Sequence, residues 1–476
     1  MSNNLADKTK KGFIWSAIET FSGQAVQFVI GVILARLLDP SVFGIIGMLT
    51  IFLALSDSII DSGFGNALMQ KKDRNQNDYS TVFYINVGIS IIIYIIMFIA
   101  APYIAAFYDM PILNPITKVI SLKFVLTSLM LVQVTKITIE LNFKKLTKIR
   151  LTCSIISGIC GIILAYSGFG VWSLVAQQLI NALLQVVLIW TFSRWIPSLC
   201  FSTESFNKLF KYGSKLLLTG LYGPIFENIN NLIIGKFYTP MALGYYARAH
   251  SLVQYPSSNI TTIINRVSFP VLCSMQDDDV KLLKSLRRLV VQTYFIVFPL
   301  MFGLLAAAGP LVDVLLTSKW ADCVPYIRIL CLSMSLYPLC GYNIDAILSK
   351  GHSDIHLRLD VIKKVFIIAV LAVTASISVT AICIGAVIST MFSWLLVGHY
   401  AGKTIQFTIG TQIKDLFPSF IISIIMMIAV YFIEIFGFAS GLTLLLQIIT
   451  GIIVYGGLSF LFNKTQLVET FKLLHK

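Results

Sequence analysis

Hydrophobic segments alternate along the chain with short polar, proline or glycine clusters, and this pattern continues from end to end. Each apolar segment is roughly 20 to 30 residues long, which is enough for an α-helix to cross a bilayer. We therefore predict an all-α polytopic membrane protein with about 14 transmembrane helices. The predicted helices are residues 12–38, 42–69, 78–107, 111–141, 149–167, 170–194, 206–236, 240–274, 285–308, 323–349, 355–378, 380–402, 414–437 and 441–462.

The pattern also repeats within the chain. The stretch LLDPSVFGIIGM is matched 200 residues later by FYTPMALGYYAR, so that Pro40 corresponds to Pro240 and Gly44 to Gly244. Six spans return a chain to the same side of the membrane, which predicts two parallel six-helix repeats related by an axis along the membrane normal. The predicted parts are a leader (1–11), an N-lobe of helices one to six (12–196), a C-lobe of helices seven to twelve (206–403), helices thirteen and fourteen (414–462) and a tail (463–476).

Composition excludes a set of soluble domains. Hydrophobic residues make up 57% of the chain and charged residues 12%, whereas soluble domains carry about 25% charged residues. The net charge of +14 does not indicate nucleic-acid binding, because no soluble stretch is longer than about 20 residues. Membrane orientation explains the charge better: with a cytoplasmic N-terminus, 27 of the 36 Lys and Arg residues fall on the cytoplasmic side. We therefore expect both termini in the cytoplasm and no cleaved signal peptide.

The 8 cysteines indicate neither a metal site nor a disulfide framework. No CxxC pair or His/Cys cluster is present, and the cysteines are expected to be inert buried thiols. We predict no cofactor and no metal.

Several basic residues fall inside or at the ends of the predicted helices. A charge buried in lipid is costly, so these side chains should face an aqueous or protein interior. Lys118 and Lys136 are 18 residues apart, which is five helical turns, and they should share one face of their helix. For residues close to a helix end, the alternative is that the long side chain reaches the lipid headgroups. The candidate cationic binding residues are Arg36, Lys118, Lys123, Lys136, Arg248 and Arg266.

A smaller set of acidic residues accompanies them. Each carboxylate either carries a coupling ion or neutralises a neighbouring Lys or Arg, and the sequence leaves both roles open. In the stretch GPIFENINN, Gly223 and Pro224 predict an interruption of the seventh helix that would expose backbone groups to an ion or substrate. The acidic candidates are Glu19, Asp57, Asp61 and Glu227.

Five stretches carry a resemblance to the polysaccharide flippases (Wzx-type) of the multidrug/oligosaccharidyl-lipid/polysaccharide (MOP) exporter superfamily. They are ARLLDPSVFGIIGM (35–48), DSGFGNALMQKKD (61–73), GYYARAHSLVQYPSSNI (244–260), RVSFPVLCSMQDD (266–278) and SKWADCVPYIRILCL (318–332). The resemblance implies a fold similar to multidrug exporters, with two six-helix lobes around a central cavity and two additional C-terminal helices. It also implies a bacterial inner-membrane protein that is not an enzyme.

The resemblance further implies a cargo. Such flippases move undecaprenyl-pyrophosphate oligosaccharides from the cytoplasmic to the outer leaflet by alternating access, for lipopolysaccharide O-antigen, exopolysaccharide or related polymers. The cationic residues would hold the pyrophosphate, and Tyr245, Tyr255 and Asn259 would contact sugars. Expected partners are this lipid-linked oligosaccharide, membrane lipid and other polysaccharide assembly proteins, with no nucleic acid.

Three alternatives remain open at this point. A multidrug cation antiporter of the same superfamily should have a carboxylate-dominated cavity. A membrane polysaccharide polymerase or ligase should have a sizeable outside loop with catalytic residues, whereas the longest predicted one, about 309–322, is short. A scaffold protein without transport activity is the third.

Overall fold

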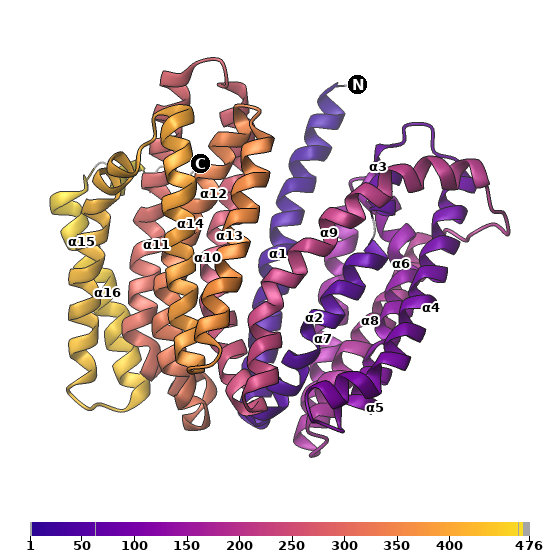
Figure 1. Cartoon of the computed structure of the whole chain (residues 1–476), viewed down its shortest axis with the longest axis horizontal. Helices are drawn as coiled ribbons and strands as arrows, with labels where there is room; N and C mark the ends of the chain where they lie inside the picture. The colour runs from indigo at the N-terminus through magenta and orange to yellow at the C-terminus, as the bar shows by residue number, and fades with distance from the viewer. Residues whose placement is uncertain (1, 62, 465, 470–476) are drawn as a thin grey trace. The chain divides into compact units, whose positions relative to one another are not determined.

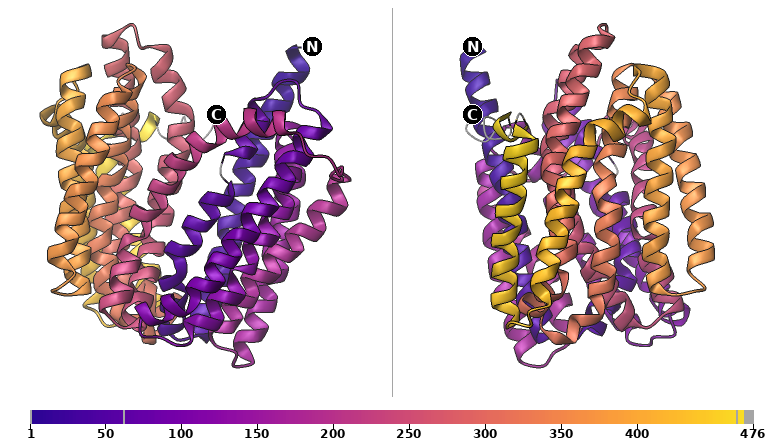
Figure 2. Two further views of the ribbon diagram at one scale, coloured as in Figure 1. Left: turned by 45° about the vertical axis from the view of Figure 1, so that its right-hand side comes forward. Right: turned by 90° about the vertical axis from the view of Figure 1, so that its left-hand side faces the viewer.

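The computed structural model describes the backbone of residues 2–61, 63–464 and 466–469. Side chains are described for these residues except 2–14, 16–17, 61, 208–219, 221 and 258–268. The chain divides into two compact units, Met1–Gly244 and Tyr245–Lys476. Within each unit the helices run roughly parallel or antiparallel to one another (Figures 1 and 2).

Every element that the structure describes in the first unit is a helix. These helices are α1 (Ser2–Leu37), α2 (Pro40–Asp61), α3 (Phe64–Gln70), α4 (Gln76–Phe107), α5 (Leu113–Ile120), α6 (Leu122–Ile139), α7 (Phe143–Tyr166), α8 (Val171–Ser193), α9 (Thr203–Phe237) and the first residues of α10 (Pro240–Ser274).

Local signals in the sequence explain where several of these helices begin. Pro40 and Pro240 are the first residues of α2 and α10, a position where the missing amide hydrogen costs nothing and the fixed φ suits the helix. Asn75 caps α4: its side chain accepts from the Asp78 amide, while the Asp78 carboxylate accepts from the Asn75 amide. This reciprocal capping box satisfies two backbone donors at the helix start.

The first unit has an aromatic core between α3, α4, α6 and α8. Phe83 of α4 contacts Trp190 and Trp195 edge to face, with ring centroids 6.0 Å and 6.1 Å away. Elsewhere α1 packs closely on α7, because Gly158 has no side chain: a Cβ there would lie 2.1 Å from Cδ1 of Ile30. This close approach brings polar residues of α1 and α7 together.

The second unit continues α10 and is organised around α11. Its further elements are α11 (Asp279–Leu316), the 3₁₀ helix η1 (Ser318–Cys323), α12 (Val324–Ser349), α13 (Ser353–Thr374), α14 (Val379–Ile405), α15 (Ile409–Glu434) and α16 (Ser440–Phe462). α11 packs against α12, α15 and α16. Arg287 of α11 holds Asp415 of α15 in a two-pronged ion pair of 2.7 Å and 2.6 Å. The last two helices are therefore part of this unit.

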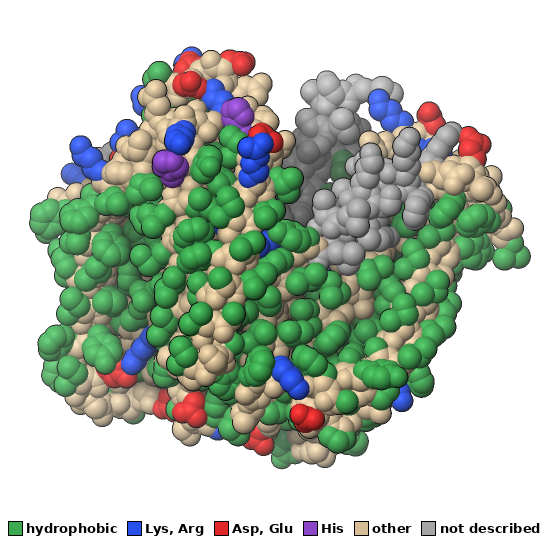
Figure 3. All heavy atoms as spheres, viewed as in Figure 1, with side chains coloured by type: hydrophobic (Ala, Val, Ile, Leu, Met, Phe, Trp, Pro, Cys, Tyr) green, Lys and Arg blue, Asp and Glu red, His purple; other side chains and the backbone are tan. Residues whose placement is uncertain are grey.

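The exposed surface is that of a multi-pass membrane protein. Eleven helices in the described part of the chain are long and apolar enough to cross a membrane. Their outer sides are apolar, for example Ile92 of α4 and Ile452 of α16, which are 58% and 69% exposed. On the face seen in Figure 3, hydrophobic side chains cover the flank of the second unit, and charged side chains gather towards its two ends.

The predicted helices agree with the structure in position, with several corrections. The interval 42–69 is divided into α2 and α3, with Gly63 at φ 72° before α3, and 111–141 is divided at Ser121 into α5 and α6. The count of about 14 spans is not confirmed, because 11 helices among the described residues meet the length and composition of a span.

The expected interruption at Pro224 is wrong. α9 continues through this residue, since a proline removes a single amide donor and the helical hydrogen bonds on both sides persist. The predicted start of the C-lobe before α9 also differs from the compact units. α9 packs against α2, α3 and α4, so it belongs to the first unit.

Three of the basic residues assigned to the cytoplasmic side lie within helices, inside the intervals predicted as 355–378 and 149–167. Lys363 and Lys364 lie in the middle of α13, where both pair with Asp360 at 3.3 Å and 3.0 Å. Arg150 lies inside α7, which begins at Phe143.

Candidate functional site

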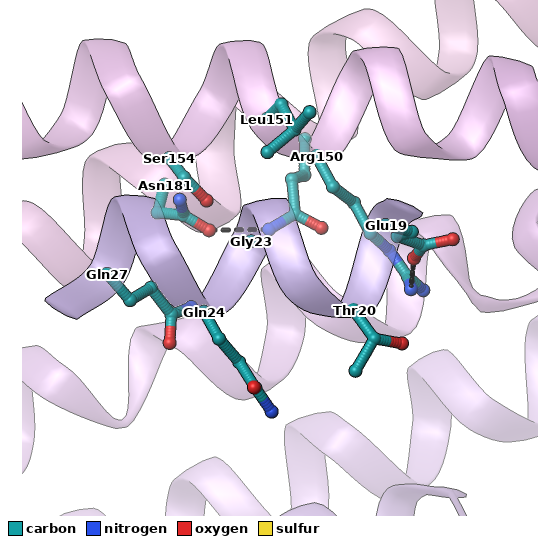
Figure 4. A pocket seen from close by; sticks show the side chains of 10 residues that line it. Glu19, Thr20, Gly23, Gln24, Gln27, Arg150, Leu151, Ser154 and Asn181 are labelled. Atoms are coloured by element: carbon teal, nitrogen blue, oxygen red, sulfur yellow. Dashed lines mark hydrogen bonds and ion pairs between the residues drawn. The ribbon is translucent and has the colours of Figure 1, made fainter. Parts of the chain in front are cut away.

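A polar cavity of about 420 Å³ lies in the first unit, among helices that are otherwise apolar. Three helices line it, α1, α7 and α8 (Figure 4). The lining residues are Glu19, Thr20, Gly23, Gln24 and Gln27 from α1, Arg150, Leu151 and Ser154 from α7, and Asn181 and Gln185 from α8.

Helical spacing explains why these side chains meet. On α7, Arg150 and Ser154 are four residues apart, as are Asn181 and Gln185 on α8. Residues four apart lie one above the other on the same face of a helix. Each helix therefore presents a short polar stripe, and the packing of α1 on α7 and of α7 on α8 turns the stripes towards one space.

The cavity contains one ion pair. The Arg150 guanidinium donates to the Glu19 carboxylate, and Figure 4 shows the two side chains pointing towards each other from α7 and α1. Glu19 is mostly shielded, with 15% of its side chain exposed, whereas 46% of the Arg150 side chain is exposed. The arginine is thus the more accessible partner.

The rest of the lining is uncharged and partly preorganised. Asn181 accepts a hydrogen bond from Gln185 and donates to Ser157, 3.0 Å away, so that a chain of hydrogen bonds runs along α7 and α8. On the other wall, the Gln24 side-chain oxygen is buried, and no described residue donates to it. A buried acceptor of this kind is suited to a hydroxyl or amide donor of a ligand.

None of the predicted cationic residues of the first unit lines this cavity, and each has different surroundings. Lys123 of α6 pairs with Asp57 of α2 at 3.0 Å. Lys118 of α5 lies over the Phe98 ring, 4.6 Å from its centroid. The shared stripe expected for Lys118 and Lys136 is interrupted between α5 and α6; Lys136 is half-buried in the last turn of α6.

Arg36 lies at the C-terminal end of α1, whereas Glu19 of the cavity pair lies in the middle of this helix. It is an exposed residue in the last turn of this helix.

In the second unit, Arg248 is the central candidate. Its guanidinium carbon lies 5.7 Å from the centroid of the Trp320 ring. Tyr245 packs edge to face on the same tryptophan, and its hydroxyl donates to the Lys319 carbonyl oxygen at 3.1 Å. The buried Tyr245 is thus engaged within this unit rather than turned towards a ligand, while Tyr255 is half-buried on α10.

Of the four remaining candidates, one is exposed, and the side chains of the other three are not among those that the structure describes. Glu227 is exposed on α9, in an unbroken helix. The side chains of Asp61, Asn259 and Arg266 lie outside the described residues. Among the described residues, no group of three or more His, Cys, Asp and Glu side chains is placed to hold a metal ion.

Sequence reasoning missed most of the cavity. Only Glu19 was a candidate, whereas the structure adds Gln24, Arg150, Asn181 and Gln185. For the uncharged residues, the available signal is the spacing of amides and hydroxyls at intervals of three or four within apolar segments.

A family model described as polysaccharide biosynthesis protein matches residues 33–325, more than half of the chain. The chain belongs to this family, as its resemblance to polysaccharide flippases predicted.

Relatives extend the match over most of the length. Lipopolysaccharide biosynthesis protein WzxC of Escherichia coli is 26% identical over 78% of this chain and 76% of its own. Teichuronic acid biosynthesis protein TuaB of Bacillus subtilis is 24% identical over 74% and 73%, respectively. Succinoglycan biosynthesis transport protein ExoT of Rhizobium meliloti is 25% identical over 72% and 69%.

Solved structures show the same fold. The lipid II flippase MurJ in an inward closed conformation superposes with a TM-score of 0.77, covering 96% of this chain and all of its own, at 16% identity. An inward-facing multidrug transporter of the MOP superfamily superposes with a TM-score of 0.61, over 81% of this chain and 96% of its own, at 12% identity. The chain is thus a multi-pass membrane protein of a polysaccharide biosynthesis family.

Proposed function

We propose that this protein moves undecaprenyl-pyrophosphate-linked oligosaccharides from the cytoplasmic to the outer leaflet of the bacterial inner membrane by alternating access. We also propose that the protein has two six-helix lobes, about 14 membrane spans and both termini in the cytoplasm. The relatives support it, because their names refer to lipopolysaccharide, teichuronic acid and succinoglycan. The likeness to MurJ supports a fold compatible with lipid flipping.

One observation carries the proposal: a cavity lined by amides and hydroxyls within an apolar helical unit. Asn and Gln side chains each offer donors and an acceptor, which match the hydroxyl groups of a sugar. A hydrophobic drug would leave such groups unsatisfied at a cost of roughly 1–3 kcal/mol each. The lining therefore suits a polyhydroxylated cargo.

Charge supports the same cargo. Arg150 in the cavity offers a cationic group for pyrophosphate, and Lys123 and Arg248, which do not line the cavity, are separate candidates. Moving two negative charges outward under an inside-negative potential of 100 mV releases about 4.6 kcal/mol, at about 2.3 kcal/mol per charge. The membrane potential can therefore drive the export of such a lipid.

The test is transbilayer movement of a fluorescent undecaprenyl-pyrophosphate oligosaccharide in proteoliposomes with an imposed potential. We expect movement with the wild-type protein and its loss in Asn181→Leu, which removes the hydrogen bonds of the cavity wall. Asp415→Asn, which alters an ion pair in the second unit, is the matched control and should keep transport. A wild-type protein that extrudes organic cations but moves no lipid-linked sugar would instead support the multidrug exporter.

A further inference from the structure

The Glu19–Arg150 pair has a geometry that relates directly to anion binding. A guanidinium presents a planar fork of N–H donors that fits a carboxylate or a phosphate equally well. In the cavity, Glu19 accepts from this fork while almost half of the Arg150 side chain stays exposed. A phosphate in the cavity and the Glu19 carboxylate would therefore compete for the same donors.

We propose that Glu19 is an internal stand-in for the cargo's phosphate: it holds Arg150 when the cavity is empty of cargo, and the phosphate displaces it. This proposal rests on the proposed function and deepens it. Binding then exchanges one anion for another on a single arginine. Simultaneous contact of both anions with one guanidinium is disfavoured, because like charges at that distance repel.

Gly23 leaves room for this exchange. It lines the cavity one turn after Glu19, and a Cβ built on it would meet no atom within 4 Å. Helical side chains lean towards the N-terminus, so a large residue at position 23 would extend over Glu19. Glycine keeps the space beside the ion pair open to an incoming group.

The exchange has a consequence for turnover. A cationic site that only attracts phosphate would retain it, whereas a carboxylate that returns to Arg150 promotes release. Removal of the Glu19 charge should therefore strengthen binding and slow transport, which is the opposite of what the loss of a direct cargo contact would do. This pairing of effects separates an internal competitor from an ordinary binding residue.

The first experiment measures binding of inorganic pyrophosphate and of farnesyl pyrophosphate to the full-length protein in nanodiscs of uncharged lipid. We expect Glu19→Gln to lower the Kd about fivefold, since a partly exposed ion pair contributes up to about 1 kcal/mol. Arg150→Gln should raise the Kd at least about tenfold. Arg150→Lys should have a Kd between those of the wild type and Arg150→Gln. Inorganic pyrophosphate isolates the phosphate contribution, and farnesyl pyrophosphate adds that of the lipid tail.

Asp415→Asn is the matched control, because it removes an Arg–carboxylate pair between α11 and α15, and its Kd should equal that of the wild type. Gly23→Leu provides a second measurement that leaves all charges in place, and it should raise the Kd by blocking access. An unchanged Kd in Glu19→Gln, or unchanged binding in both Arg150→Gln and Gly23→Leu, would overturn the exchange.

The flipping assay separates this result from the proposed function. Tighter pyrophosphate binding in Glu19→Gln without any flipping by the wild type would keep the exchange and reject the flippase. Normal wild-type flipping with the same Kd and the same rate in Glu19→Gln would keep the flippase and reject the exchange.

Discussion

The Cα of Gly44 lies against the carbonyl group of Pro240 so closely that a Cβ on Gly44 would be 1.7 Å from the proline oxygen. The reciprocal contact joins Gly244 to Pro40, where a Cβ would lie 1.9 Å from the oxygen. Both contacts lie within the first unit, where the first turns of α2 and α10 meet backbone to backbone. Two stretches that match in sequence 200 residues apart are therefore direct neighbours.

Alanine at either glycine should destabilise the protein. The obstructing atoms belong to the backbone and cannot rotate away, so Gly44→Ala and Gly244→Ala should each cost at least about 1–3 kcal/mol, as overpacking does. Thermal unfolding of the detergent-solubilised protein measures the effect. Gly88→Ala in α4 is the control, since a Cβ there meets nothing within 4 Å and should be tolerated. Equal melting temperatures for all three variants would contradict the close contact.

The Lys123–Asp57 pair should contribute little to stability. Its side chains are 26% and 41% exposed, and a pair of this exposure has a coupling free energy of about 1 kcal/mol or less. A double-mutant cycle with Lys123→Ala and Asp57→Ala in thermal unfolding measures this coupling free energy.

If Lys123 also binds pyrophosphate, Lys123→Ala should insert normally into the membrane but lose flipping, while Lys123→Arg should retain part of the flipping rate. Full flipping by Lys123→Ala would exclude that role.

Arg248→Ala should stop flipping without preventing membrane insertion. The guanidinium lies over Trp320, which orients it by a cation–π interaction of about 0.5–2 kcal/mol. Trp320→Phe, which keeps an aromatic face, should therefore retain more flipping than Trp320→Leu. The measurement is the initial rate of flipping in proteoliposomes at equal protein content. Normal rates in both Arg248→Ala and Lys123→Ala would reject a cationic cargo site.

The start of α11 should respond to acid. Hydrogen bonds from the Lys281 amide and from its side chain lower the pKa of Asp278, the N-cap residue, below its ordinary value of 3.8. The cap is therefore intact at pH values above 3.8 and is lost as the pH falls through the lower value in the folded protein. Amide hydrogen exchange in the first turn of α11 reports this loss.

Asp278→Asn is the matched variant for this measurement, because asparagine caps a helix equally well and does not titrate in this range. The wild type should match Asp278→Asn at pH 6 and exchange faster than it at the lowest pH values. Identical exchange of the two proteins throughout acid titration would show that the carboxylate does not support the cap.

Helix positions were largely predictable where local signals are strong. The interval predicted as 240–274 agrees with α10 at both ends, because proline starts the helix and a polar stretch follows it. α7 was predicted to begin six residues too late, because Lys144, Lys145 and Lys148 suggested a loop. Their long side chains are compatible with a helix end, where the charged groups reach solvent and the stems lie along apolar surface.

The candidate site was predictable only in its chemistry. Spacing indicated that charges inside apolar helices need partners, but it did not say which partner each would have. Lys123 pairs with Asp57 on another helix, whereas Lys118 lies over an aromatic ring. Both lysines come from one predicted helix, and the difference depends on what packs beside each of them.

Hydropathy and helical periodicity are local properties of the sequence. They are sufficient to define an all-helical membrane protein, because lipid requires each spanning segment to satisfy its own backbone hydrogen bonds. They also define the polar stripes of the individual helices. The cavity is not local. Glu19 and Arg150 are 131 residues apart, and Asn181 lies on a third helix. Gly158 allows α1 to approach α7, and this contact across the chain is what joins the separate stripes into one site.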